Sequence, residues 1–149
     1  MRKFWLVGLL ALICSTAYAQ TAKPRFKISV GVSVTAVRTA DKTSLEASAR
    51  SFLERELRSL GDVDLADAIT AQHSAYLNVM EVHSKTGSHL SYAVTYSLIE
   101  WKRCEGRFLT ELLDNGLYVT SSEGLRKTIE DIVVDIDNNA FAKLRKSAK

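Results

Sequence analysis

Residues 26–36, Phe-Lys-Ile-Ser-Val-Gly-Val-Ser-Val-Thr-Ala, alternate between apolar and small or polar side chains along their whole length. A period of two with β-branched residues on one side is typical of a β-strand that buries one face. The opposite side holds Lys27 and then only small residues, which are Ser29, Gly31, Ser33 and Thr35. The stretch therefore predicts a sheet that packs one face on a core and leaves small side chains on the other.

An amphipathic helix is predicted directly after this strand. Thr43-Ser44-Leu45-Glu46 has the spacing of a capping box, so the helix is expected to begin there. Gly61 suits the residue just past the helix end. The apolar side chains fall on one stripe at helical spacing: Leu45, Ala49, Phe52, Leu53, Leu57 and Leu60.

Further strands are predicted in the middle of the chain. A short strand at 62–65 precedes a strand at 76–83, which a turn connects to a long partner strand at 89–101. Asp114-Asn115-Gly116 is a typical turn sequence between two apolar segments, so a second, shorter hairpin is predicted over residues 108–120.

A second helix is predicted to close the domain, capped by Ser121 or Ser122. Its apolar stripe consists of Leu125, Ile129, Ile132, Val133, Ile136, Ala140 and Leu144. The element order is β-α-β-β-β-(ββ)-α. Since each helix has one apolar stripe and the longest strands one apolar face, we expect an α+β fold, with a mainly antiparallel sheet and two helices packed on one face.

The first 19 residues have the three parts of a secretory signal peptide. Arg2 and Lys3 are followed by ten uncharged, mostly apolar residues, and Ala17-Tyr18-Ala19 precedes Gln20, so cleavage is expected between Ala19 and Gln20. The apolar run is too short for a membrane-spanning helix, which needs about 20 residues. The large Ile13 before Cys14 argues against lipidation of that cysteine. We therefore expect an exported protein with no stable membrane span after cleavage.

Cleavage would leave a flexible lead at 20–25 and a single α+β domain at 26–149. Loss of two leader cations would leave 18 basic residues against 17 acidic ones, which lowers the net charge from +3 to about +1. This balance does not favour a nucleic-acid partner. Cys104 would then be the single cysteine, either buried or at an inert edge, or free to pair between chains.

The sequence predicts no catalytic, cofactor-binding or metal-binding residues. His83 and His89 flank the first turn, but the expected register places His83 opposite Leu90, and no third ligand is nearby. The segment 135–139 begins like a calcium loop, yet it lacks the central glycine and the closing glutamate. Single scattered glycines do not form a phosphate-binding loop.

The aromatic residues suggest two kinds of surface. Tyr92 and Tyr96 alternate with aliphatic residues, so we expect them in the core rather than in a ligand groove with Tyr76. Trp101, followed by Lys102 and Arg103 at a strand end, is the candidate contact for a partner.

Four stretches carry a resemblance to known proteins: residues 26–37, Leu53-x-x-x-Leu57-x-x-Leu60-Gly61, residues 76–79 and residues 92–99. Their order resembles that of small bacterial envelope modules, such as the curli-secretion lipoprotein and the N-terminal domain of the Tol-system propeller protein. The resemblance spans about residues 26–103. It implies a periplasmic, non-catalytic domain that acts through protein contacts.

The leading hypothesis is therefore an exported, non-enzymatic domain, periplasmic or extracellular and of bacterial origin. It would bind another protein or its own copy, through a free strand edge or the face of small residues. A first alternative is the binding of a small apolar ligand or lipid between sheet and helices. A second is a small hydrolase, which would require a perturbed acid, histidine or cysteine in a cleft.

Overall fold

The structure is a computed structural model that describes residues 25–36 and 39–148. The predicted signal peptide, its cleavage between Ala19 and Gln20, and most of the flexible lead lie outside the described residues. Within them, five strands form one sheet in the order β2-β1-β3-β4-β5. The strands are β1 (Phe26–Thr35), β2 (Val63–Leu65), β3 (His73–His83), β4 (His89–Cys104) and β5 (Arg107–Thr120).

The sheet is mixed. Strand β1 runs parallel to both β2 and β3, whereas the pairs β3–β4 and β4–β5 are antiparallel. The parallel pairs arise because helix α1 (Thr39–Ser59) carries the chain back along the sheet before β2 and β3 begin. The predicted α+β class is confirmed, with parallel pairing confined to the N-terminal part of the sheet.

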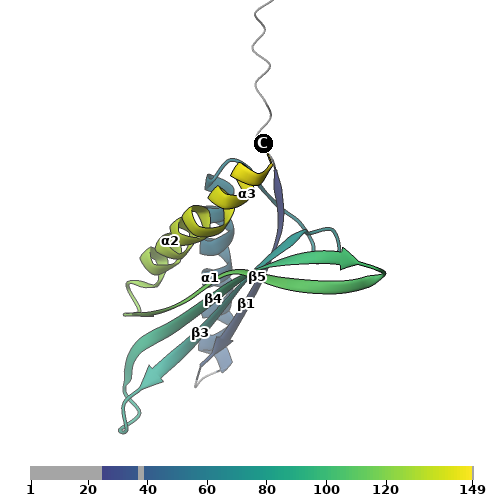
Figure 1. The fold of residues 1–149 in the computed structure, drawn as a ribbon. Helices are drawn as coiled ribbons and strands as arrows, with labels where there is room; N and C mark the ends of the chain where they lie inside the picture. The colour runs from purple at the N-terminus through teal and green to yellow at the C-terminus, as the bar shows by residue number, and fades with distance from the viewer. Residues whose placement is uncertain (1–24, 37–38, 149) are drawn as a thin grey trace, which may run out of the picture.

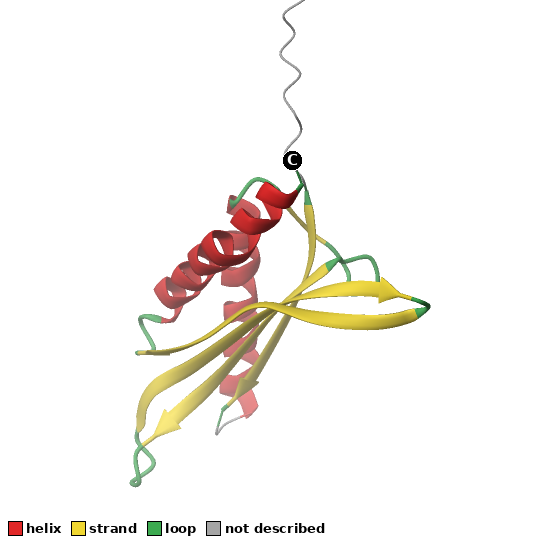
Figure 2. Ribbon diagram, viewed as in Figure 1, coloured by secondary structure: helices red, strands yellow, loops and turns green. Residues whose placement is uncertain are grey.

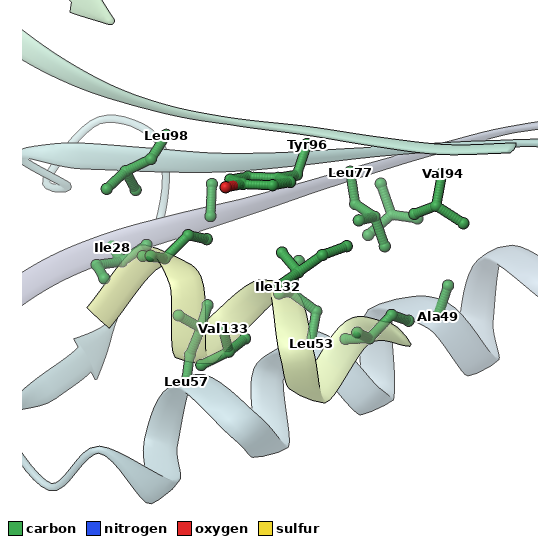
Figure 3. Packing of buried hydrophobic residues seen from close by; sticks show 14 of the residues in the cluster. Ile28, Ala49, Leu53, Leu57, Leu77, Val94, Tyr96, Leu98, Ile132 and Val133 are labelled. Carbon is green, nitrogen blue, oxygen red and sulfur yellow. The ribbon is translucent and has the colours of Figure 1, made fainter. Parts of the chain in front are cut away.

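The helices cover one face of the sheet (Figures 1 and 2). The C-terminal helical segment is continuous but divided into α2 (Leu125–Ile136), the π-helical turn η1 (Asp137–Phe141) and α3 (Ala142–Ser147). Side chains from β1, β3 and β4 meet those of α1 and α2 in a dry layer between sheet and helices (Figure 3). Fully or almost fully buried members include Ile28, Ala49, Leu53, Leu57, Leu77, Val94, Leu98 and Ile132.

The predicted start of the first helix is wrong. Helix α1 begins at Thr39, so Thr43 lies inside it and cannot act as the N-cap. Asp41 supplies the negative charge that the first turn of a helix favours. The predicted stripe is correct in its centre, because Ala49, Leu53 and Leu57 are buried.

The predicted second hairpin is also wrong. Strand β5 runs without interruption, and its Gly116 pairs with Tyr96 of β4 instead of forming a turn. The glycine is needed there because a Cβ at residue 116 would lie 2.5 Å from Cε1 of Tyr96. The chain turns earlier, at Glu105 and Gly106, which have φ angles of 49° and 79°, as a two-residue hairpin turn requires.

The closing helix differs from the prediction at both ends. Its N-cap is Gly124, whose N–H is accepted by the Ser121 hydroxyl at 3.2 Å. The π-helical turn near its end places Phe141 fully in the core, a residue that the predicted stripe did not contain. Phe141 stacks on Phe26 with ring centroids 4.8 Å apart and so connects the last helical turns to the first strand.

Candidate functional site

The helices leave the other side of the sheet uncovered, and we call this side the open face. It carries the small residues predicted for β1, continued on the neighbouring strands by larger side chains. Its central and β5-side members are Gly31, Ser33, Tyr76, Asn78, Met80, Thr95, Ser97, Leu112, Asn115, Leu117 and Val119. Several of the apolar members are strongly exposed, such as Leu117 at 66% and Val119 at 71%.

A shallow groove of about 830 Å³ crosses the open face from β1 to β5. On the β1 side, Gly31 lies directly opposite Tyr76 in the ladder. A Cβ at Gly31 would lie 2.5 Å from Cδ1 of Tyr76, so the missing side chain allows the tyrosine ring to lie across β1. On the β5 side, Leu112 and Leu117 form the wall. The groove is thus bounded by an aromatic ring and two leucines over a floor of small residues.

The groove offers little for acid–base chemistry. The residues that line it include no aspartate, glutamate, histidine, cysteine, lysine or arginine. Its polar groups are the amides of Asn78 and Asn115 and the hydroxyls of Ser33, Tyr76, Thr95 and Ser97. Tyr96 touches the groove, but its hydroxyl donates to Asp114 Oδ2 at 3.0 Å, and burial, with that bond, raises its pKa. These groups suit recognition by contact and hydrogen bonding.

The ends of β4 and β5 continue past the helices as a projecting hairpin, residues 101–112, which we call the arm (Figure 2). Every residue of the arm is exposed. Its apolar side chains include Phe108 at 72% exposed and Leu109 at 52%. Cys104 lies at its tip, paired with Arg107, and is exposed, so of the alternatives left open for this cysteine the structure excludes burial.

The three predicted contact residues lie at the start of the arm. Trp101 is 38% exposed, and its Nε1 donates to Ser74 Oγ at 2.8 Å, which ties the indole to the sheet. Lys102 is held by Glu111 and Glu100, and these carboxylates raise its pKa. The guanidinium of Arg103 lies 5.7 Å from the centre of the Phe108 ring. The three predicted residues therefore lie at one end of an apolar surface. The sequence did not predict the exposed side chains of β5, because the turn wrongly expected at Asn115-Gly116 divided them between two strands.

The tyrosines of β4 and the tyrosine of β3 lie on different faces of the sheet. Tyr96 is 6% exposed and belongs to the core, and Tyr92 packs against the core while remaining partly exposed. Tyr76 lies on the open face and is 44% exposed. The alternative that grouped Tyr76 with a groove was thus correct for this residue, but the groove lies on the far side of the sheet from the helices.

The two histidines beside the β3–β4 turn come together, contrary to the predicted register. The ladder shifts between Val82 and His83, so His83 pairs with His89 rather than with Leu90. Their ring centroids are 5.7 Å apart, and His83 Nε2 lies 3.2 Å from Glu81 Oε2. Within the described residues, no three His, Cys, Asp or Glu side chains are placed to hold a metal ion.

Two buried polar groups lie at the edge of the core beside β1. The carboxylate of Asp62 is fully buried and accepts from Arg145 Nε at 2.6 Å and Nη2 at 2.9 Å. Arg145 also donates to Asp137 at 2.6 Å, and these two carboxylates, Asp62 first, raise its pKa. Nearby, His73 is 4% exposed, and neither ring nitrogen has a hydrogen bond of acceptable geometry. Burial lowers the pKa of His73, and Glu100 opposes this shift.

Asp135 and Asp137, which belong to the segment that begins like a calcium loop, have partners within the protein. Besides the bond from Arg145 to Asp137, Tyr118 donates to Asp135, and this bond together with partial burial raises the pKa of Tyr118 to about 12. Asp135 therefore connects α2 to β5, and Asp137 helps to hold Arg145, which bonds to Asp62 just before β2.

The fold and the open face define a small α+β domain with one covered and one exposed sheet surface. No helix within residues 25–36 and 39–148 is long and apolar enough to cross a bilayer. No protein-family model matches the chain, and no curated protein matches it.

Three solved structures with a similar arrangement come from bacteria. One is a variant of PelC from Paraburkholderia phytofirmans, described as a dodecamer, with 22% identity over 78% of this chain and 87% of that chain and a TM-score of 0.46. A hypothetical protein from Chlamydia trachomatis has 8% identity over 83% and 90% of the two chains, with a TM-score of 0.44. A lipoprotein from Neisseria meningitidis has 14% identity over 77% and 99%, with a TM-score of 0.32.

The likeness to the curli-secretion lipoprotein and to the Tol-system propeller protein stays a prediction. The identities and TM-scores are too low to transfer an activity or an assembly to this chain.

Proposed function

We propose that this protein is an exported, non-enzymatic bacterial envelope domain, periplasmic or extracellular, that acts by binding proteins through its open face. The observation that carries the proposal is the asymmetry of the sheet. One face is covered by α1 and α2, whereas the other exposes aliphatic and aromatic side chains around a groove whose lining has no acidic residue, histidine, cysteine, lysine or arginine. A continuous exposed apolar surface of this kind is typical of a contact site.

The test compares two aliphatic side chains that are equally exposed on opposite sides of the molecule. Met80 lies on the open face and is 45% exposed, and Val134 lies on α2 and is 50% exposed. Each is replaced by glutamate in the tagged, full-length chain, which is then crosslinked in a bacterial host and purified. Neither change should alter the free energy of unfolding by more than about 0.5 kcal/mol, because both positions are half open to water.

We expect Met80→Glu to lower the amount of crosslinked protein about tenfold, the equivalent of about 1.4 kcal/mol of binding energy, because a carboxylate would lose water at the contact. Val134→Glu should leave the amount unchanged. Equal yields from the two variants, or a wild-type protein that crosslinks to nothing, would refute the proposal.

The groove also favours a second candidate, the binding of a small apolar ligand or lipid, since its volume lies in the range of ligand sites. This candidate predicts a lipid or another apolar molecule in stoichiometric amount in an organic extract of the purified protein. An extract without one would remove it. A hydrolase finds no support in the groove, because its lining has no acid, histidine or cysteine.

A further inference from the structure

Strand β5 forms one edge of the sheet and is unusual for an edge strand. It has 14 residues, whereas β2 at the opposite edge has three. Its neighbour on one side is β4, and within the described residues no strand lies on its other side. A long edge with exposed apolar side chains can accept a further strand, and natural proteins usually shorten, bend or charge such edges.

A β-bulge divides β5 into two halves of opposite alternation. Leu98 pairs with Asp114 but Ile99 pairs with Leu112, so Leu113 is the extra residue. Leu113 packs against the core, and Asp114 accepts from Tyr96 on the same side, as expected of the two residues of a classic bulge. Before the bulge, the open face therefore carries even-numbered residues, 108, 110 and 112. After it, the open face carries odd-numbered residues, 115, 117 and 119.

This change of alternation makes β5 complementary to itself. If two β5 strands pair antiparallel over their full length, residue 107 lies opposite residue 120, and each even-numbered residue opposes an odd-numbered one. In an unbulged strand that pairing would set open-face side chains against core-side ones. Here it matches the faces throughout. It places Phe108 opposite Val119, Thr110 opposite Leu117 and Leu112 opposite Asn115.

The side chains and charges agree with this register. Phe108 and Val119, exposed by 72% and 71%, would become direct neighbours, and the two-fold symmetry would form that pair twice. Glu111 would lie directly opposite Gly116, which carries no charge. A register shifted by two residues would instead set Glu111 opposite Asp114, two carboxylates that repel each other.

We propose that a second copy of this chain binds along β5, antiparallel and about a two-fold axis at the bulge, to form one continuous ten-stranded sheet. The inference rests on the proposed function, since it names one of the proteins that the domain contacts. The two strands would overlap over about 45 Å. Along this length, the backbone N–H and C=O groups that point outward from each β5 edge would face those of the other copy. A two-fold pair closes on itself and leaves no free β5 edge.

The test reads the register directly. The native cysteines are replaced (Cys14→Ser, Cys104→Ser), and one population of the full-length chain then carries Leu112→Cys while a second, differently tagged population carries Asn115→Cys. Mixing and mild oxidation should give the mixed disulfide dimer, because opposed residues lie within disulfide range. Leu112→Cys mixed with Leu117→Cys is the matched control. In the proposed pairing residue 117 lies two residues beyond residue 115, the position opposite residue 112, so these two cysteines would not oppose each other.

We expect at least about tenfold more dimer from the 112–115 mixture than from the 112–117 control. As a second measurement, Val119→Lys should raise the dissociation constant of the dimer at least about tenfold, and Val134→Lys on α2 should leave it unchanged. Equal crosslinking in the two mixtures, or a wild-type protein that sediments as a monomer at every concentration, would overturn the inference.

The two proposals can fail separately. If Met80→Glu lowers the crosslinking yield but the cysteine mixtures give equal dimer, the open face binds proteins and the β5 pairing is wrong. If the 112–115 dimer forms and Met80→Glu has no effect, the β5 pairing is correct and the open face is not the contact surface.

Discussion

Replacing Arg145 by methionine should destabilise the domain by removing the partner of a buried charge. The carboxylate of Asp62 has no exposed surface, and both of its oxygens accept from the Arg145 guanidinium. Removal of one partner of a fully buried ion pair costs about 3 to 5 kcal/mol. Arg145 is 26% exposed, so water would enter the space that it leaves, and we expect a smaller loss of about 2 to 3 kcal/mol.

The free energy of unfolding is measured by urea denaturation at pH 7, followed by circular dichroism. Asp137→Asn serves as the control, because Asp137 bonds to the same guanidinium but is 30% exposed, and its loss should cost less than about 1 kcal/mol. In the double variant Asp62→Asn/Arg145→Met, the buried charge is gone. This variant should therefore be more stable than Arg145→Met alone.

Two results would refute this reasoning. A loss below about 1 kcal/mol for Arg145→Met would mean that Asp62 does not depend on the guanidinium for its stability in the core. Strict additivity of the two single substitutions in the double variant would show that the residues are not coupled.

The other two predictions concern His73 and Gly31. Burial holds the pKa of folded His73 below its ordinary value of 6.5, so the unfolded chain binds a proton that the folded protein does not, and the domain should lose stability as the pH falls below 6.5. Urea denaturation from pH 8 to 5 should show a shallower loss of the free energy of unfolding for His73→Leu than for the wild type, and equal slopes for the two would contradict this. Gly31→Ala should lower the free energy of unfolding by about 1 to 3 kcal/mol, because the new Cβ would displace the Tyr76 ring. In a Tyr76→Ser background the same change should cost almost nothing, and an equal cost in both backgrounds would show that this contact is not the cause.

The sequence was most informative where a segment meets only one partner surface. The alternation of residues 26–36 and the stripe of Ala49, Leu53 and Leu57 agree closely with the observed burial. Val30 and Ala36, which are partly buried, and Ser29, which is buried on the opposite side, depart from the pattern. In both segments local periodicity and tertiary packing favour the same arrangement, so the pattern alone is enough.

Elsewhere, tertiary contacts overrode local signals. Asn115-Gly116 is a strong turn sequence, but β4 extends for 16 residues and pairs with β5 before, at and after this dipeptide. Gly116 instead leaves space for the Tyr96 ring, which a side chain at this position would contact too closely. The true turn is Glu105-Gly106. Its glycine suits a positive φ, but Glu105 has little preference for one, so the local signal was weaker than that of Asn115-Gly116. Without the β4–β5 register, the exposed residues of β5 could not be assigned to one face.

The candidate site was therefore only partly predictable. A face of small residues on β1 could be identified from alternation, and Trp101 could be singled out as an exposed aromatic anchor. The groove needs the side-by-side placement of Gly31, Tyr76 and Leu117, which come from three strands. The bulge at Leu113 leaves no mark in the sequence, because its effect is a shift of one residue in the pairing with β4.

The π-helical turn η1 also determines which residues the C-terminus presents to the core. In a regular α-helix, at about 100° per residue, Phe141 would lie about 140° around the axis from Ile136, and Arg145 would point to solvent. The wide turn takes up one residue, so Phe141 reaches the core and Arg145 reaches Asp62. A shorter relative that lacks one residue of this turn would keep both contacts with an ordinary helix, so chain length can vary here without loss of the C-terminal anchor.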